Sequence, residues 1–263
     1  MRTMPTVLAV FAHPDDMELL CAGTLKLLVD RGWTMATVTL CGGDLGSTTE
    51  TREAIHARRL KEAEAGAAVV GGAYAWAGLD DFTLHYCPEQ LVAVVEQLRR
   101  FAPDVVITHS PEDYLPDHEE CSRLVRMACF TAGVPLYKTA SPATGKPIPA
   151  LYYADALEGK DLLGRPVVPM FRIDVTTTFA VRERALACHV SQREWLRSHH
   201  GIDQYLLENE RLARGYGEHC GVRYAEGFRQ HLGHAYPQEN ILGHALAGFL
   251  KADPAAIPST PKD

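Results

Sequence analysis

Val7-Leu8-Ala9-Val10-Phe11-Ala12 is an unbroken apolar run, and a run of this length predicts a strand buried on both faces of a sheet. Apolar residues then recur at helical spacing from Met17 to Arg31, and Gly32 is typical of a helix C-terminus. The β-branched stretch Thr34 to Cys41 predicts a second strand. The chain therefore opens with a strand–helix–strand unit.

This alternation continues as far as about residue 132. Further helices are predicted over 54–70, 89–101 and 119–132, and a further strand over 104–108. Repeated units of this kind imply parallel strands joined by right-handed crossovers. The predicted fold class is α/β, a Rossmann-like three-layer sandwich with a mostly parallel central sheet and helices on both faces.

The pattern changes after Gly133, where prolines interrupt the chain. Strands are predicted over 150–154 and 171–175, and helices over 181–200 and 203–214. We expect one domain spanning residues 1–263. Its Rossmann-like core covers about 1–132, and a loop-rich, helical part covers 133–263.

The composition is that of a folded, mildly acidic protein. Lys and Arg number 26 against 33 Asp and Glu, the net charge is −7, and 46% of the residues are apolar. The acidic balance argues against a nucleic-acid partner, and no apolar run approaches the roughly 20 residues that cross a bilayer. The seven scattered cysteines form no C-x-x-C pair, which is typical of reduced thiols. With no cleavage site of a signal peptide, we expect a cytoplasmic protein without nucleic-acid or membrane partners.

Two clusters of ionisable residues follow predicted strands. His13-Pro14-Asp15-Asp16-Met17-Glu18 comes directly after the first strand, where open α/β sheets bind ligands. One Asp of this segment could cap the following helix, but capping does not readily account for the histidine and both acids. The second cluster runs from His109 to His118, after the strand predicted over 104–108.

These two loops become neighbours if both strands are central in the sheet. His13, Asp16 and His118 would then converge as two imidazoles and one carboxylate. Three nitrogen or oxygen ligands with an open fourth position are the arrangement of a catalytic zinc site.

The two clusters also resemble a known family. His13-Pro14-Asp15-Asp16-Met17-Glu18 is similar to the HPDDxE signature of the PIG-L/LmbE-like zinc N-deacetylases, and Pro116-Asp117-His118 is similar to the end of their H-P-D-H motif. Weaker resemblances extend over most of the chain, at Thr39–Gly46, Arg59–Glu62, Asp81, His189–Gln192 and Ala225–Phe228. The resemblance implies an enzyme that removes acetyl groups from N-acetylglucosaminyl compounds.

The resemblance also implies roles for single residues. His13, Asp16 and His118 would ligate Zn²⁺, and Asp15 would be the general base. Zinc lowers the pKa of a bound water toward about 7, so a carboxylate beside it can complete the deprotonation. The candidate substrate-binding residues are Arg59, Asp81 and Tyr114, and Glu226 is a candidate partner that orients a ligand.

One position departs from the family pattern. Leu115 stands where H-P-D-H begins with a histidine that assists the reaction, and a leucine cannot donate a hydrogen bond. Tyr114, His109 or a histidine of the C-terminal third could substitute, zinc and Asp15 could act alone, or activity could be lost. Losing one oxyanion donor costs about 10²–10³ in rate.

The predicted activity is therefore zinc-dependent removal of an N-acetyl group from an N-acetylglucosamine-type sugar or its conjugate. Two alternatives stay open. The first is an amidase that cleaves a larger thiol- or sugar-conjugate amide, and the second is a catalytically weak zinc-bearing protein that binds N-acetylated sugars. The resemblance further implies a homo-oligomer, a trimer or hexamer, in which His231, His234 or His244 could close the site from the same or another subunit.

Overall fold

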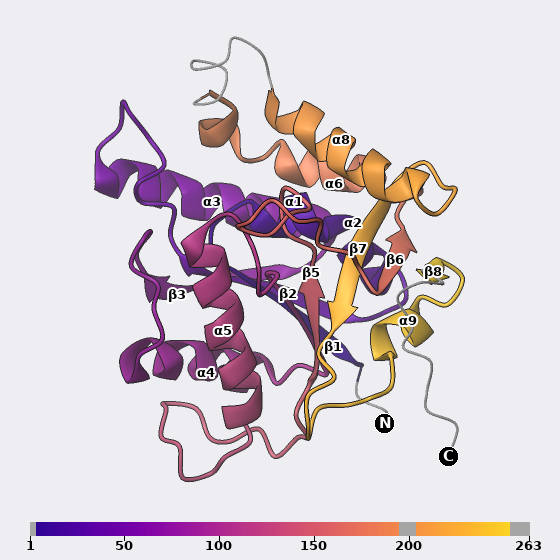
Figure 1. Ribbon diagram of the computed structural model, residues 1–263. Helices are drawn as coiled ribbons and strands as arrows, with labels where there is room; N and C mark the ends of the chain where they lie inside the picture. Colours follow the sequence, from indigo (N-terminus) through magenta and orange to yellow (C-terminus); the bar gives the residue numbers. More distant parts are fainter. Residues whose placement is uncertain (1–3, 195–203, 253–263) are drawn as a thin grey trace, which may run out of the picture.

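A computed structural model describes residues 4–194 and 204–252 (Figure 1). Within these residues, eight strands form one sheet in the order β3-β2-β1-β4-β5-β7-β6-β8. The strands are β1 (Thr6–Phe11), β2 (Thr34–Cys41), β3 (Ala73–Leu79), β4 (Val105–Thr108), β5 (Ala150–Ala154), β6 (Phe171–Asp174), β7 (Ala225–Gln230) and β8 (Leu250–Ala252). The helices are α1 (Asp16–Leu20), α2 (Ala22–Val29), α3 (Arg52–Val70), α4 (Pro88–Phe101), α5 (Pro116–Thr131), α6 (Phe179–Leu186), α8 (Gln204–Glu218) and α9 (Ile241–Ala245).

The predicted α/β class is confirmed. Strand β1 pairs in parallel with β2 on one side and with β4 on the other, and β5 continues the parallel part of the sheet. The strand order reverses at β1, because the chain moves outward to β2 and β3 and then returns to β4. The carboxyl ends of β1 and β4 therefore flank the topological switch point, where sheets of this kind bind ligands.

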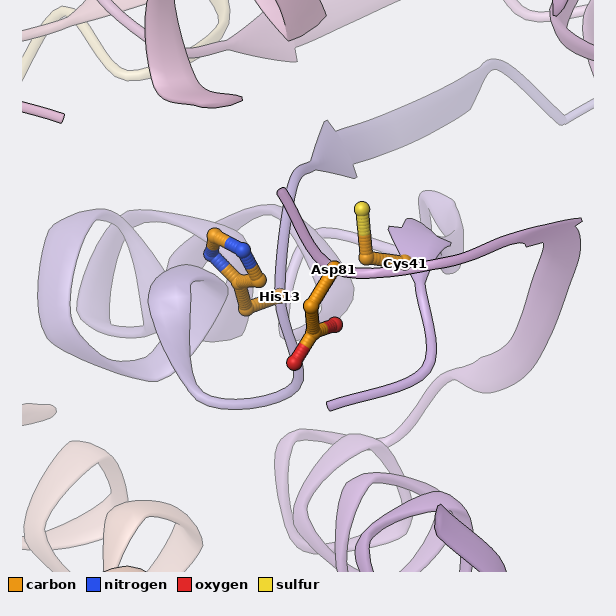
Figure 2. A group of neighbouring side chains, drawn as sticks. All are labelled: His13, Cys41 and Asp81. Carbon is orange, nitrogen blue, oxygen red and sulfur yellow. The ribbon is translucent and has the colours of Figure 1, made fainter. Parts of the chain in front are cut away.

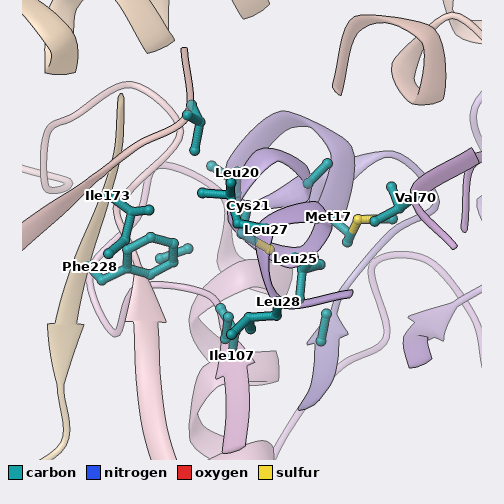
Figure 3. Packing of buried hydrophobic residues seen from close by; sticks show 14 of the residues in the cluster. Met17, Leu20, Cys21, Leu25, Leu27, Leu28, Val70, Ile107, Ile173 and Phe228 are labelled. Atoms are coloured by element: carbon teal, nitrogen blue, oxygen red, sulfur yellow. The ribbon is translucent and has the colours of Figure 1, made fainter. Parts of the chain in front are cut away.

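Alternate residues of β1 pack into two separate hydrophobic cores, one on each face of the sheet. Val7, Ala9 and Phe11 face a core that also contains residues of α1 and α2, and Figure 3 shows part of that packing. Leu8 and Val10 face the opposite core, which contains residues of α4 and α5. Both faces of the strand are therefore buried by helices, which explains its uninterrupted apolar sequence.

Two predicted helices are wrong in their extent. The helix expected from Met17 to Arg31 is two helices that meet at Cys21, whose φ of −150° departs from helical geometry. The helix expected over 181–200 ends at Leu186, and helical geometry resumes only at Val190. Beside the first break, the backbone N–H groups of Gly23 and Thr24 donate to the buried Glu226. Beside the second, His189 and Ser191 contact Glu18 and Glu62.

The C-terminal part of the chain contributes more strands than the sequence predicted. Strand β7 pairs antiparallel with β5 and β6, and β8 pairs antiparallel with β6. The sheet thus runs without interruption from the predicted core into the residues beyond 132. Among the described helices, none is long and apolar enough to cross a membrane.

Candidate metal centre and its chamber

The loops after β1 and β4 bring the predicted ligand residues together. The ligand atoms of His13, Asp16 and His118 all lie within 4.8 Å of one another. His118 Nε2 lies 3.4 Å from Asp16 Oδ1, and His13 Nδ1 lies 3.5 Å from Asp16 Oδ2. Two imidazoles and one carboxylate thus meet at the switch point of the sheet.

Two further carboxylates orient the histidines, and the sequence analysis missed both. Asp117 Oδ2 lies 3.0 Å from His13 Nε2, and Asp113 Oδ1 lies 3.0 Å from His118 Nδ1. Each imidazole is thereby held by one ring nitrogen, while its other nitrogen faces Asp16. Histidines that bind metals are typically held in this way.

The cluster favours positive charge. Burial alone would lower the pKa of His13, but hydrogen bonds to Asp117 and Asp16 raise it to about 9. Burial would also lower the pKa of His118, but the Asp16 charge and the hydrogen bond to Asp113 raise it to about 10. The His118 charge holds the pKa of Asp16 well below its usual range despite burial. Without a metal, protons supply the positive charge that a cation would supply here.

His109 lies beneath this cluster and does not face its opening. Its ring stacks on His118 with centroids 3.9 Å apart, and its Nε2 lies 3.0 Å from the Ala12 amide nitrogen. Burial and the neighbouring His118 charge lower the pKa of His109 to about 4. The ring is therefore neutral and fully buried, and it supports His118 from behind.

Asp15 is held beside the cluster in an unusual backbone conformation. Its φ of 111° lies in the left-handed region, which non-glycine residues adopt at a free-energy cost. The Tyr205 hydroxyl donates to Asp15 Oδ2 at 2.5 Å, and Arg59 Nη2 lies 3.3 Å from the same oxygen. Arg59 also donates to the Pro14 carbonyl at 2.6 Å. The turn is therefore fixed from two sides, and nothing in the local sequence pointed to Tyr205.

A second group of potential ligands, His13, Cys41 and Asp81, fits a metal less well. Figure 2 shows the Cys41 thiol and the Asp81 carboxylate pointing to opposite sides. The two Asp81 oxygens accept backbone N–H groups of Gly43 and Leu45, at 2.9 and 3.1 Å. Burial raises the pKa of the Cys41 thiol. Asp81 instead holds the glycine-containing loop after β2.

The cluster opens into a cavity of about 450 Å³, which we call the metal chamber. Its walls include all three predicted substrate-binding residues, Arg59, Asp81 and Tyr114, together with Leu115. They also include Tyr205, which comes from the start of α8. The residues that the sequence placed near the substrate therefore do share one cavity.

Glu226 lies elsewhere. Its carboxylate accepts the backbone N–H groups of Gly23 and Thr24, at 2.9 and 2.8 Å, and pairs with Arg182 Nη1 at 3.0 Å. Arg182 also donates to the Leu19 carbonyl, so the buried pair anchors the junction of α1 and α2. The predicted role of orienting a metal ligand does not match these contacts.

The segment His189–Gln192, which resembles a family motif, follows the break after α6 and contacts two other helices. His189 Nε2 lies 3.1 Å from Glu18 Oε1, and the Ser191 hydroxyl donates to Glu62 Oε2 at 2.6 Å. Gln192 lines the metal chamber. The segment thus ties α1 and α3 to the chamber wall, whereas Trp195, His199 and His200 lie outside the described residues.

The C-terminal histidines do not reach the chamber within this chain. The His231 amide donates to the Leu151 carbonyl near the start of β5, and its ring lies 2.9 Å from the Tyr153 hydroxyl. The start of β5 is the opposite edge of the sheet from the metal chamber, because β5 runs parallel to β4. His234 and His244 are exposed, and neither lines the chamber. The expectation that one of them closes the site of its own chain is therefore wrong.

Comparison with known proteins identifies the protein family to which the segment with the metal cluster belongs. Residues 8–129 match the PIG-L family, described as GlcNAc-PI de-N-acetylase. This segment holds β1, β4 and the whole metal cluster. It is a PIG-L family domain, and the resemblance predicted from the motifs is confirmed.

Individual relatives cover most of the chain. Diacetylchitobiose deacetylase of Thermococcus kodakarensis is 28% identical over 242 residues, which are 85% of this chain and 82% of the relative. The 4-oxalmesaconate hydratase of Pseudomonas putida is 24% identical over 71% of this chain and 74% of the relative. The structure of N,N'-diacetylchitobiose deacetylase from Pyrococcus horikoshii superimposes with a TM-score of 0.74 at 24% identity, covering 91% of this chain and 90% of that one. The structural likeness confirms the fold.

Proposed function

We propose that the chain is a zinc-dependent N-deacetylase that removes the acetyl group from an N-acetylglucosamine-type sugar or its conjugate. The observation that carries the proposal is the cluster of His13, Asp16 and His118 beside Asp15, at the switch point of a PIG-L family domain. The relatives named as deacetylases support the choice of reaction.

The residues present fit a zinc ion. Zinc in catalytic sites takes three protein ligands of the nitrogen and oxygen type and keeps one position open. His13, Asp16 and His118 supply two nitrogens and one oxygen, and Asp117 and Asp113 hold the two rings in place. When bound, zinc would polarise the acetamide carbonyl and make a water more acidic.

We assign the proton transfers of this reaction to Asp15. Tyr205 and Arg59 both engage its Oδ2, so Oδ1 is the oxygen available to the substrate. We assign to Oδ1 the removal of a proton from the attacking water and its return to the departing amine. A carboxylate that is fixed in this way loses little entropy at the moment of proton transfer.

Tyr114 is the group that we assign in place of the histidine missing at Leu115. Tyr114 lines the chamber, and its ring contacts that of His118 edge-on with centroids 5.8 Å apart. Tyr114 is half-exposed, and its partial burial and the nearby Asp16 charge raise its pKa, so its hydroxyl stays protonated and can donate to the developing oxyanion.

Leu115→His tests this assignment. Leu115 lines the same chamber as Tyr114, so a histidine there adds a donor. Tyr114→Phe loses the donor, so its kcat should fall by as much as about 10²-fold. Adding Leu115→His to Tyr114→Phe should restore much of that kcat, whereas Leu115→His alone should change the wild-type kcat little, because Tyr114 already donates there. Steady-state acetate release measures both effects. An unchanged kcat on adding Leu115→His to Tyr114→Phe would contradict the assignment.

Metal binding is expected to release protons. The pKa values of about 9 for His13 and about 10 for His118 mean that the metal-free rings are protonated at neutral pH. Both must lose a proton to bind a metal, so affinity should rise as the pH rises toward these values. Calorimetric titration of the metal-free protein with Zn²⁺, in buffers of different ionisation enthalpy, counts the protons. An affinity independent of pH would show that the cluster is not the binding site.

Hydration of a carbon–carbon double bond is the competing reaction, because one relative is named a hydratase. The metal chamber suits such a substrate less well. Oxalmesaconate carries several carboxylates, whereas the chamber walls beside the metal cluster include Asp15 and Asp81. The guanidinium of Arg59 is already engaged by Asp15 and the Pro14 carbonyl.

The decisive experiment compares both reactions on one preparation. The purified protein is assayed for bound metal, for acetate release from N-acetylglucosamine, diacetylchitobiose and N-acetylglucosaminyl conjugates, and for hydration of 4-oxalmesaconate by its change in absorbance. We expect zinc and acetate release. Hydration without acetate release would replace the proposed reaction, and bound zinc without any turnover would favour a sugar-binding protein.

A further inference from the structure

Three cavities follow one another along α8. The metal chamber shares the walls Leu19, Tyr114, Leu157 and Tyr205 with a second cavity of about 590 Å³. The second cavity in turn shares Glu158, Arg211 and Leu212 with a third of about 430 Å³. We call the three together the α8 groove.

The groove is longer than a single sugar. Tyr205 stands between its first two cavities, and Tyr216 of the same helix lines the third. At the helical rise of 1.5 Å per residue, these two positions are about 16 Å apart along α8. A ligand with its acetamide in the metal chamber would need further units to reach the third cavity.

The far end of the groove is cationic, although the chain as a whole carries a net charge of −7. The third cavity is lined by Arg172, Arg211 and His219, against the single acid Glu158. Arg172 is almost fully buried, at 5% exposure. The nearby Asp155 is only partly ionised at neutral pH, because burial raises its pKa to about 7.

We propose that the α8 groove selects extended N-acetylated glycoconjugates that carry an anionic group, a carboxylate or a phosphate, at the end remote from the acetamide. The inference rests on the proposed function. The acetamide of the terminal sugar lies in the metal chamber, intermediate units lie against Leu157 and Leu212 of the second cavity, and the anion lies near Arg211 and Arg172.

Two arginines of α8 provide a matched pair of variants. Arg211 lines the second and third cavities, whereas Arg214, one turn later, lines none of the three. Both are largely exposed, at 68% and 54% of the side chain, and each pairs with a glutamate of the preceding turn. Arg211→Glu and Arg214→Glu therefore make the same change in net charge, and each removes one Arg–Glu ion pair within α8. They differ because only Arg211 lines the groove.

The test uses three substrates of equal length. They are the trimer of N-acetylglucosamine, the same trimer with its reducing end oxidised to a carboxylate, and the trimer 1-phosphate. We expect higher kcat/KM for an anionic trimer than for the neutral one, with the difference residing in KM. Arg211→Glu should lower kcat/KM for that anionic trimer at least about tenfold and leave the neutral trimer within about twofold. Arg214→Glu should change none of the three.

The outcomes separate this inference from the proposed function. Acetate release from all three trimers at equal kcat/KM, or equal effects of the two arginine variants, overturns the anion preference alone. If the zinc-loaded protein releases acetate from N-acetylglucosamine or diacetylchitobiose but from none of the trimers, the inference is overturned and the proposed function stands. Acetate release from none of these compounds overturns the proposed function, and the inference with it. Whichever anionic trimer responds to Arg211→Glu identifies the anion as carboxylate or phosphate.

Discussion

Asp15→Asn is expected to keep its metal and to lose acetate release by about 10²–10⁴-fold, the usual contribution of a general acid–base group. The amide of asparagine cannot accept a proton as the carboxylate does, while the ligands His13, Asp16 and His118 remain in place. The fold should tolerate the change, because asparagine is among the few residues that adopt a positive φ readily and the backbone at Asp15 has a φ of 111°.

Metal analysis and kcat on the same preparation measure this effect. Asp30→Asn is a suitable control, since Asp30 is half-exposed at the end of α2 and lies outside the metal chamber. An Asp15→Asn protein with a kcat close to the wild type would show that Asp15 only shapes the turn before α1.

His118→Ala is expected to lose the metal and, with it, the activity. Loss of a residue that merely orients a ligand lowers metal affinity by 10–100-fold, so loss of the ligand itself should lower it by more than about 100-fold. The variant also removes the imidazole that pairs with Asp16 at 3.4 Å and leaves that buried carboxylate with less compensating charge. Elemental analysis after dialysis, followed by titration with Zn²⁺, gives the affinity.

His234→Ala provides the comparison, because His234 is exposed and does not line the metal chamber of its own chain. It should keep both metal and activity. If His118→Ala retained a full equivalent of tightly bound zinc, the metal would have to be held by another group, and the assignment of the cluster would fail.

The sequence predicted the N-terminal half of the fold, which carries the metal cluster. The uninterrupted apolar run of β1 and the alternating strands and helices up to residue 132 indicated a parallel sheet, because strands buried on both faces leave continuous apolar runs and amphipathic helices leave a helical period. It missed β3, β7 and β8. The antiparallel strands β7 and β8 follow a proline-rich stretch and a helix, and such short strands carry little periodicity of their own.

The sequence also determined which residues gather at the switch point. His13, Asp16 and His118 could be named because each follows a strand whose carboxyl end faces the same edge of the sheet. The carboxylates that hold the two histidines, Asp113 and Asp117, lie in the cluster from His109 to His118 that the sequence had singled out. Their roles depend on side-chain direction, which spacing does not supply.

Only the tertiary structure decided the rest of the site. Tyr205 reaches Asp15 across 190 positions of the chain, and Glu226 reaches the start of α2 across more than 200. The α8 groove exists because α8 packs beside the loop after β5. Local patterns encode whether a segment is a helix or a strand, but contacts between distant segments depend on the order of strands and the packing of helices. These are settled only when the whole chain buries its apolar faces together.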